Sequence, residues 1–175
     1  MSATELRPIL VGLAPLIDDS SRVLILGSFP SEMSLAKHEY YGNPQNHFWH
    51  VMEALFGIDC TSPYAERTSR MLNHGVAVWD VIAECAREGS GDDRIQNPAA
   101  NPILDLLVGH PLLGHVAFNG GTASAKALTL TPDIFSLPSV QCERLPSTSP
   151  RHARMRLADK VESWRRIKHW LVENE

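Results

Sequence analysis

Short apolar runs alternate along this chain with longer stretches in which apolar positions have helical spacing. Four segments have the length of strands. Residues 23–27, 76–81 and 115–119 are rich in apolar residues, and residues 140–145 mix apolar and polar positions. Helical spacing, caps and breaker residues predict helices over about residues 4–17, 44–56, 62–73, 98–108, 122–128 and 151–172. Because strands that alternate with helices form a parallel sheet covered on both faces, we expect a single-domain, three-layer α/β/α fold with a central, mostly parallel four-stranded sheet.

Length and composition are those of one soluble domain that spans residues 1–175. Hydrophobic residues make up 43% of the chain and charged residues 21%, and the longest apolar runs are far too short to cross a bilayer. The N-terminus has no basic stretch leading into an apolar core, so we expect no secretion signal and a cytoplasmic location. The three widely spaced cysteines predict neither a disulfide framework nor a metal or iron–sulfur cluster.

The net charge of −4 excludes a surface that is basic as a whole, so a nucleic-acid partner would need a local basic patch. One such patch begins at Arg151 and includes His152, Arg154 and Arg156, at the start of the last predicted helix. Cations at a helix start oppose the helix dipole, and phosphates supplied by a ligand would remove that conflict. A second basic cluster, at residues 165–169, is typical of a solvated helix face.

Candidate site residues stand at the ends of all four predicted strands. They are Gly27, Ser28 and Phe29 after the first strand, Asp80 in the second, Asn119 in the third, and Ser147, Thr148 and Ser149 after the fourth. Since the carboxyl ends of parallel strands lie at one edge of a sheet, we expect these residues to converge in one cleft. Turn formation explains the glycine and the serines equally well, whereas it explains Asp80 less well because apolar residues 81–83 follow it.

Three ordered segments carry a family resemblance: residues 27–31 (Gly-Ser-Phe-Pro-Ser), residues 43–49 (Asn-Pro-Gln-Asn-His-Phe-Trp), and residues 146–150 (Pro-Ser-Thr-Ser-Pro) with His152. Over about residues 23–164 the chain resembles the uracil-DNA glycosylase superfamily, and within it the hypoxanthine-DNA (deoxyinosine) glycosylase branch. The resemblance implies a DNA repair enzyme that flips a deaminated base, hypoxanthine or uracil, out of DNA and hydrolyses its N-glycosidic bond to leave an abasic site. We accordingly expect DNA containing a deaminated base as the partner, a monomer, and no metal or cofactor.

The resemblance assigns roles to residues around the flipped base. Gly27 and Ser28 match the first motif, a loop that lies against the base and the attacking water. Phe29 departs from that motif, because many members place Asp or Asn there and a phenyl ring can neither position nor deprotonate water. In the hypoxanthine branch the catalytic role falls on the asparagine that Asn46 matches, and Tyr41 matches the aromatic residue on which the base stacks.

Asp80 falls where uracil-specific members carry an asparagine that reads the base edge, and Asn119 completes the predicted base-binding set. A carboxylate accepts a hydrogen bond from the N1–H of hypoxanthine but cannot donate one to a carbonyl. An ionised Asp80 therefore favours a base that is read mainly through its N–H.

Residues 147–152 match the second motif, which grips the DNA backbone and sends a wedge side chain into the duplex. Arg151 holds the wedge position, and Arg154 adds attraction for phosphates. Backbone N–H groups and serine or threonine hydroxyls can bond phosphates without net charge. The predicted DNA-binding residues are therefore Ser147, Thr148, Ser149, Arg151, His152 and Arg154.

Each central assignment has a structural alternative. With Asn43 as the cap of the second predicted helix, Asn46 could bond only its own backbone at the helix start. Tyr41 could be an aromatic residue of a surface turn, Asp80 a cap of the next turn, and His152 a helix-start residue without function.

Two other functions stay open. A catalytically silent nucleic-acid-binding member of the fold fits the loss of the usual acidic residue at Phe29. A serine esterase would combine Ser28 or Ser31 with His152 and an aspartate, but the chain has no Gly-x-Ser-x-Gly elbow. The absence of a Gly-x-x-x-x-Gly-Lys loop and of a dinucleotide fingerprint disfavours nucleotide-cofactor enzymes.

Overall fold

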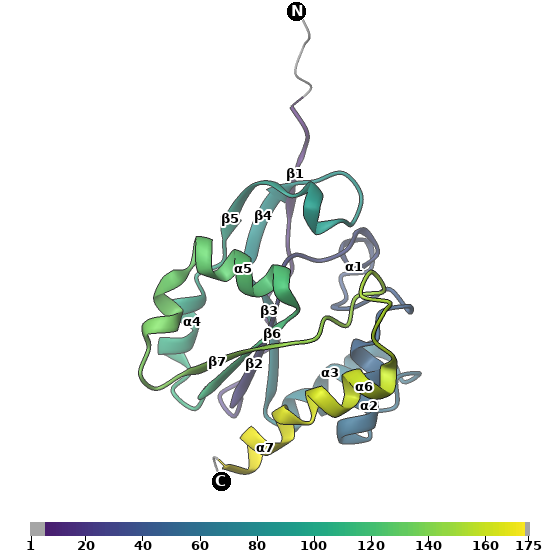
Figure 1. The fold of residues 1–175 in the computed structure, drawn as a ribbon, viewed down its shortest axis with the longest axis vertical. Helices are drawn as coiled ribbons and strands as arrows, with labels where there is room; N and C mark the ends of the chain where they lie inside the picture. The colour runs from purple at the N-terminus through teal and green to yellow at the C-terminus, as the bar shows by residue number, and fades with distance from the viewer. Residues whose placement is uncertain (1–5, 174–175) are drawn as a thin grey trace, which may run out of the picture.

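The central sheet has the four parallel strands that the sequence predicts (Figure 1). The computed structural model describes residues 6–173. Its larger sheet is built from β2 (Val23–Gly27), β3 (Val76–Asp80), β6 (His115–Asn119) and β7 (Gln141–Leu145). The spatial order is β3-β2-β6-β7, and every neighbouring pair is parallel. Because β2 and β3 are apolar without alternation, both are buried along their whole length.

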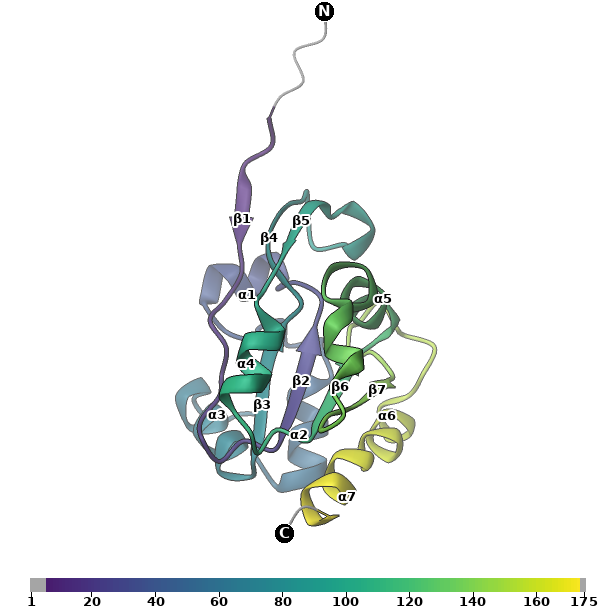
Figure 2. The same ribbon diagram turned by 90° about the vertical axis from the view of Figure 1, so that its left-hand side faces the viewer.

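Helices cover both faces of this sheet, which confirms the three-layer architecture (Figures 1 and 2). One face carries α4 (Ile103–Gly109) and α5 (Gly121–Leu130). The opposite face carries α2 (Phe48–Phe56), α3 (Tyr64–Asn73), α6 (Leu157–Trp164) and α7 (Arg166–Glu173). Large aromatic side chains fill the core on this second face, where Phe48, Trp164 and Trp170 are almost completely buried. Within residues 6–173, no helix is long and apolar enough to cross a membrane.

The structure also contains an antiparallel sheet that the apolar pattern does not predict. Its order is β1-β4-β5, formed by β1 (Ile9–Val11), β4 (Ile82–Ala86) and β5 (Gln96–Ala100). The register pairs Leu10 with Cys85 in one ladder, and irregularities interrupt the other ladder, between β4 and β5. This small sheet continues the chain directly from the end of β3, so it stands beside the carboxyl edge of the main sheet (Figure 2).

Two predicted helices are wrong where this small sheet forms. The helix expected over residues 4–17 is replaced by β1 within its described part, and residues 4 and 5 lie outside the described residues. Pro8, Gly12 and Pro15 disfavour a helix there, and the N–H of Gly12 donates to the carbonyl of Ala83 at 2.8 Å instead. The helix expected over residues 98–108 begins only at Ile103, because the preceding residues pair with β4.

Other helices also differ from the predictions. The helix expected from Pro44 starts at Phe48, after His47, so Asn43 is not its cap. The helix expected over residues 151–172 has turns at its start and begins at Leu157, and Arg165 separates α6 from α7. A short helix that was not predicted, α1 (Glu32–Lys37), follows the first motif and is capped by the hydroxyl of Ser31, which accepts from the N–H of Ser34 at 3.1 Å.

Candidate active site

A cavity of about 260 Å³ lies at the carboxyl ends of the parallel strands, which confirms the predicted convergence of the strand ends. All predicted site residues line it except His152 and Arg154. Those residues are Gly27, Ser28, Phe29, Tyr41, Asn46, Asp80, Asn119, Ser147, Thr148, Ser149 and Arg151. The other lining residues include Asp92 and Ser90, from the loop between β4 and β5.

Asp80 lies at the floor of this cavity, at the end of β3, and is 5% exposed. Gly27 makes room for it, because a Cβ at that position would stand 2.5 Å from Oδ1 of Asp80 and 3.3 Å from the hydroxyl of Tyr41. Oδ2 of Asp80 has no hydrogen-bond partner within residues 6–173. A buried oxygen without a partner is costly, so it is a candidate contact for a ligand.

The environment of Asp80 changes its ionisation. Burial raises the pKa of this carboxyl to about 7, the negative charge of Asp92 adds to the increase, and the guanidinium of Arg87 opposes it. At neutral pH the carboxyl is therefore divided between its acid and its carboxylate forms. The fully ionised Asp80 expected from the sequence is therefore wrong at neutral pH, because burial penalises the charge.

Tyr41 is held in place on one side of the cavity. Its backbone has a φ of 55°, in the left-handed region, and its ring stacks on Phe48 with centroids 4.0 Å apart and planes 17° apart. Its hydroxyl accepts a hydrogen bond from Nδ2 of Asn119 at 3.1 Å, and burial raises the pKa of the phenol. Because Phe48 covers one face of the ring, only the opposite face remains for a flat ligand. The alternative of a surface-turn aromatic does not fit this environment.

Asn119 connects β6 to the loop that follows β7. Besides its bond to Tyr41, Nδ2 donates to Oγ1 of Thr148 at 2.9 Å, and Oδ1 accepts from the N–H of Thr148 at 2.9 Å. Thr148 is fully buried, and its carbonyl accepts from the N–H of His47 at 2.9 Å. The prediction that the Thr148 hydroxyl binds a DNA phosphate is therefore wrong for this conformation, because the side chain is fully buried inside the protein, against Asn119.

Asn46 lies before α2 and not inside it. Its Oδ1 accepts from the N–H of Phe48 at 2.9 Å, and its own N–H donates to the carbonyl of Asn43 at 2.9 Å. The structural alternative is thus correct for the oxygen of this side chain. Within the described residues no hydrogen bond occupies Nδ2, so the amide can still present a donor to the cavity that it lines.

Asp92 is a site residue that sequence reasoning missed. It belongs to a short 3-10 helix, Asp92–Arg94, and its Oδ1 accepts from the hydroxyl of Ser28 at 2.8 Å. Partial burial raises the pKa of Asp92, although the bond from Ser28 opposes the increase. The composition of residues 88–93 predicts a loop and nothing more, because the hairpin that carries this loop to Ser28 is not visible in the apolar pattern.

The segment after Ser147 forms the rim of the cavity. Ser147 Oγ accepts from the N–H of Ser149 at 3.1 Å, and Ser149 Oγ accepts from the N–H of Arg151 at 3.2 Å. The Arg151 guanidinium pairs with exposed Asp93 at 3.2 Å, while Arg154 is exposed and outside the cavity. Because Arg151 and Arg154 precede the helix, the expected conflict with the dipole of α6 remains only at Arg156, its N-cap residue, whose guanidinium pairs with Asp159 at 3.2 Å.

No family model matches the chain. The hypoxanthine DNA glycosylase of Methanosarcina barkeri (strain Fusaro) is 37% identical over 110 residues, which cover 62% of this chain and 70% of that protein. The hypoxanthine DNA glycosylase of Methanosarcina acetivorans is 35% identical over 113 residues, which cover 64% of this chain and 72% of that protein. The chain belongs to the hypoxanthine-DNA glycosylase family.

Structural similarity extends this relationship to nearly the whole chain. The solution NMR structure of a candidate uracil DNA glycosylase from Methanosarcina acetivorans superimposes with a TM-score of 0.76 and 29% sequence identity. The match covers 93% of this chain and 100% of that one. As a hypoxanthine-DNA glycosylase family member within the uracil-DNA glycosylase superfamily, the chain is a DNA glycosylase, a hydrolase that acts on N-glycosyl bonds.

In this member of the hypoxanthine-DNA glycosylase family, Phe29 stands where many superfamily members have Asp or Asn, and its ring has a packing role. The ring is 7% exposed, packs in a small cluster with Ile82 and Cys85, and lies 5.1 Å below the guanidinium of Arg87. Phe29 therefore joins the first motif to the small sheet, and the carboxyl that enters the cavity beside this motif is that of Asp92.

The geometry does not support a serine esterase. Ser28 donates to Asp92, and Ser31 caps α1. His152 is exposed and outside the cavity lining, and no hydrogen bond joins a serine hydroxyl to a histidine ring in the part of the chain that the structure describes. The nucleophile–base contact that such an enzyme needs is therefore absent there.

Proposed function

We propose that this DNA glycosylase removes hypoxanthine from DNA by hydrolysis and leaves an intact strand with an abasic site. The observation that carries the proposal is the buried carboxyl of Asp80, which lines the cavity together with Tyr41 and has one oxygen without a hydrogen-bond partner among the described residues. Such a site can accept a hydrogen bond from a base while the base stacks on an aromatic face.

The target base has to leave the duplex before it can reach this cavity, because the cavity has room for a base and not for a helix. The ring face of Tyr41 that Phe48 leaves uncovered then stacks against the extruded base. Stacking of this kind contributes roughly 1–3 kcal/mol per base and tolerates any base. Tyr41 thus supplies affinity, and the choice of base falls to the groups at the cavity floor.

An ionised Asp80 favours hypoxanthine over uracil. In hypoxanthine the N1–H is flanked by O6 on one side and by C2–H on the other, so one carboxylate oxygen accepts from N1–H and the second faces C2–H. In uracil the corresponding N–H lies between two carbonyls, and the second carboxylate oxygen would face a carbonyl oxygen. An asparagine at this position would avoid that repulsion, because its amide nitrogen donates.

Bond cleavage requires stabilisation of the departing base and a positioned water. We assign the first task to Nδ2 of Asn46, which donates to the base as negative charge develops on it. We assign the second to Asp92, whose carboxylate, oriented by Ser28, holds the water that attacks the sugar. The lining residues include no lysine, which favours attack by water over a Schiff base on the enzyme.

DNA contacts surround the mouth of the cavity. The hydroxyls of Ser147 and Ser149 each accept from a backbone N–H and retain a proton to donate to a phosphate. The side chain of Arg151 is held only weakly, because exposed ion pairs such as its contact with Asp93 contribute only about 0–1 kcal/mol. It can therefore leave Asp93 and fill the space of the extruded base, while Arg154 attracts the backbone.

The test uses matched oligonucleotides that each carry one hypoxanthine, uracil or xanthine. We expect release of free hypoxanthine in the presence of chelator, and strand breakage only after alkaline treatment. Strand cleavage without alkali, or a covalent adduct trapped by borohydride, would show that the enzyme is bifunctional. Binding to the duplex without release of any base would instead identify a catalytically silent member of the fold.

A further inference from the structure

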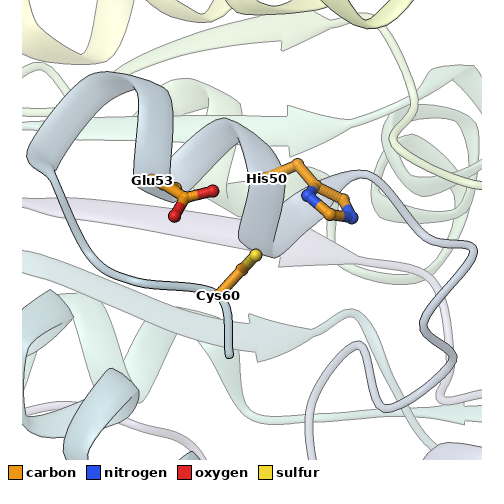
Figure 3. Close-up of side chains that lie close together, drawn as sticks. All are labelled: His50, Glu53 and Cys60. Carbon is orange, nitrogen blue, oxygen red and sulfur yellow. The ribbon is translucent and has the colours of Figure 1, made fainter. Parts of the chain in front are cut away.

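Three side chains that base excision does not use gather on the outer side of α2 (Figure 3). They are His50, Glu53 and Cys60, and one ligand atom of each lies within 4.8 Å of the others. Figure 3 shows the sulfur of Cys60 directed toward the helix, between the imidazole and the carboxylate. None of the three lines the base-binding cavity, so the cluster is separate from the active site.

The local structure explains why these residues meet. His50 and Glu53 are three residues apart on α2, which places them on the same face of the helix. Gly57 ends the helix in the left-handed region, with a φ of 68°, and its N–H donates to the carbonyl of Glu53 at 2.8 Å. Ile58 is then buried at 1% exposure, which turns the chain back against α2 and brings Cys60 beneath the other two side chains.

The position of Cys60 is fixed on its other side as well. Oδ1 of Asp59 accepts from the N–H of Thr61 at 2.8 Å and from its hydroxyl at 2.7 Å, and the carbonyl of Asp59 accepts from the N–H of Ser62 at 3.1 Å. Cys60 thus lies between the buried side chain of Ile58 and the hydrogen-bonded turn at residues 59–62. Little backbone freedom therefore remains to be lost at Cys60 when a ligand binds.

The donor set suits a transition metal. A thiolate, an imidazole and a carboxylate are all zinc ligands, with bonds of about 2.0–2.3 Å that place two tetrahedral ligands about 3.5 Å apart. Side-chain shifts of about 1 Å bring the three atoms to that spacing from their present distances. The sulfur ligand disfavours Mg²⁺ and Ca²⁺, which prefer oxygen. None of the ion pairs within residues 6–173 uses Glu53, so no cation competes for its carboxylate there.

We propose that His50, Glu53 and Cys60 bind one Zn²⁺ ion, with a water molecule in the fourth position. The thiol proton passes to solvent as the zinc–sulfur bond forms. Thiolate and carboxylate then neutralise the charge of the ion. The bound metal connects the loop at residues 57–62 to α2, the helix whose first turn follows Asn46. This expected role is structural, and base release does not run through the ion.

Cobalt titration tests the proposal directly, because Co²⁺ replaces Zn²⁺ and reports a thiolate ligand by its absorption spectrum. The full chain, reduced and stripped with chelator, is titrated with CoCl₂. We expect a thiolate-to-cobalt charge-transfer band that saturates at one equivalent and is abolished by ZnCl₂. ZnCl₂ should also raise the melting temperature of the metal-free chain, because the ion binds the folded state.

Ligand variants identify the site. Cys60→Ser and His50→Ala should each abolish the charge-transfer band. Cys142→Ser is the matched control, since Cys142 is the other half-buried cysteine, and His169→Ala on α7 controls for loss of a histidine; both should keep the band. A titration without saturable binding, or a band that persists in Cys60→Ser, overturns the proposal. The readout is metal binding itself, so the result is independent of which base the enzyme releases.

Discussion

The ionisation of a single carboxyl determines how the proposed active site distinguishes bases. Asp80 has a pKa of about 7, so small changes of pH near neutrality change the fraction that carries a charge. Only the carboxylate form combines an acceptor for N1–H with repulsion of a second carbonyl. Base preference and pH dependence are therefore two consequences of the same residue, and one substitution tests both.

We predict that Asp80→Asn raises the ratio of uracil to hypoxanthine release by roughly 10- to 100-fold, because a hydrogen bond to a charged group contributes about 1.5–3 kcal/mol. In the parent enzyme, kcat/KM for hypoxanthine should rise with pH through about 7 as Asp80 ionises. In the variant this rise should be lost. Rates of hypoxanthine and uracil release, measured for the parent and the variant between about pH 5 and 9, test both expectations. An equal loss on both bases would reduce Asp80 to a structural role.

We predict that Asp92→Asn lowers kcat by about 10²-fold or more, since general-base positioning typically contributes 10²–10⁴-fold. Asn46→Ala should lower kcat by orders of magnitude as well, and both variants should still bind abasic-site DNA. Single-turnover kinetics separate the two effects from binding. Asp93→Asn is the matched control, because Asp93 is adjacent but exposed. If Asp92→Asn retains the parent rate on single-stranded substrate, the water is positioned by another group.

Site residues differ in how far the sequence reveals them. Gly27, Tyr41 and Asp80 follow from motif order and from their position at strand ends, and the structure places all three in the cavity. The inward orientation of Thr148 depends on its bonds to Asn119, a residue 29 positions away, which no local pattern shows. The pKa of Asp80 likewise depends on burial, and burial is a property of the assembled fold.

Secondary-structure elements also differ in how well the sequence predicts them. The strands β2, β3 and β6 are mainly apolar and buried, so their ranges could be predicted to within one residue. The range of β7 could also be predicted to within one residue, although this strand is polar and mostly exposed at the edge of the sheet. β1 has only three residues and β5 lacks an apolar run, and both lie at the edges of the small sheet, partly exposed. Their hydrogen bonds to β4 stabilise them, and this pairing cannot be predicted from the pattern of apolar residues. The error at residues 98–108 has the same cause.

At the rim of the cavity, the segment at residues 149–154 contains Arg151, which lines the cavity, and Arg154, which lies outside it. We predict that Arg151→Ala slows base release from duplex DNA and spares single-stranded substrate, because a wedge is needed only where bases are stacked. Arg154→Ala, the matched control outside the cavity, should weaken binding to both substrates alike. Single-turnover rates on paired and unpaired oligonucleotides provide the comparison. Equal impairment of Arg151→Ala on both would mean that Arg151 contacts a phosphate.

For the molecule as a whole, a net charge of −4 limits how much of DNA binding can be electrostatic. We predict a shallow salt dependence, because each phosphate neutralised by a cation contributes about 0.9 to the slope of log K against log salt. Arg154→Ala should reduce the steepness by roughly one unit. Fluorescence anisotropy at several salt concentrations measures both slopes. A steep slope that Arg154→Ala leaves unchanged would place the DNA on another surface.

Stability of the whole fold should also depend on Asp80. Its pKa is about 7 in the folded chain against 3.8 normally, so the folded state binds this proton more tightly than the unfolded state. Stability is therefore lost as pH rises from about 4 to about 7, by an amount on the order of 4 kcal/mol. We predict that Asp80→Asn is more stable than the parent at pH 8 and similar at pH 4. Urea unfolding measures the difference, which should not be the same at both pH values.

The two carboxyls of the site reach the cavity by separate routes. Asp80 ends a strand of the main sheet, whereas Asp92 arrives on the loop between β4 and β5. A loop at the edge of a small sheet tolerates insertion, deletion and replacement far better than a buried strand. Evolution could thus exchange the water-handling group without disturbing the group that recognises the base. The same separation offers protein engineers a place to graft a new loop for altered chemistry while base recognition is inherited.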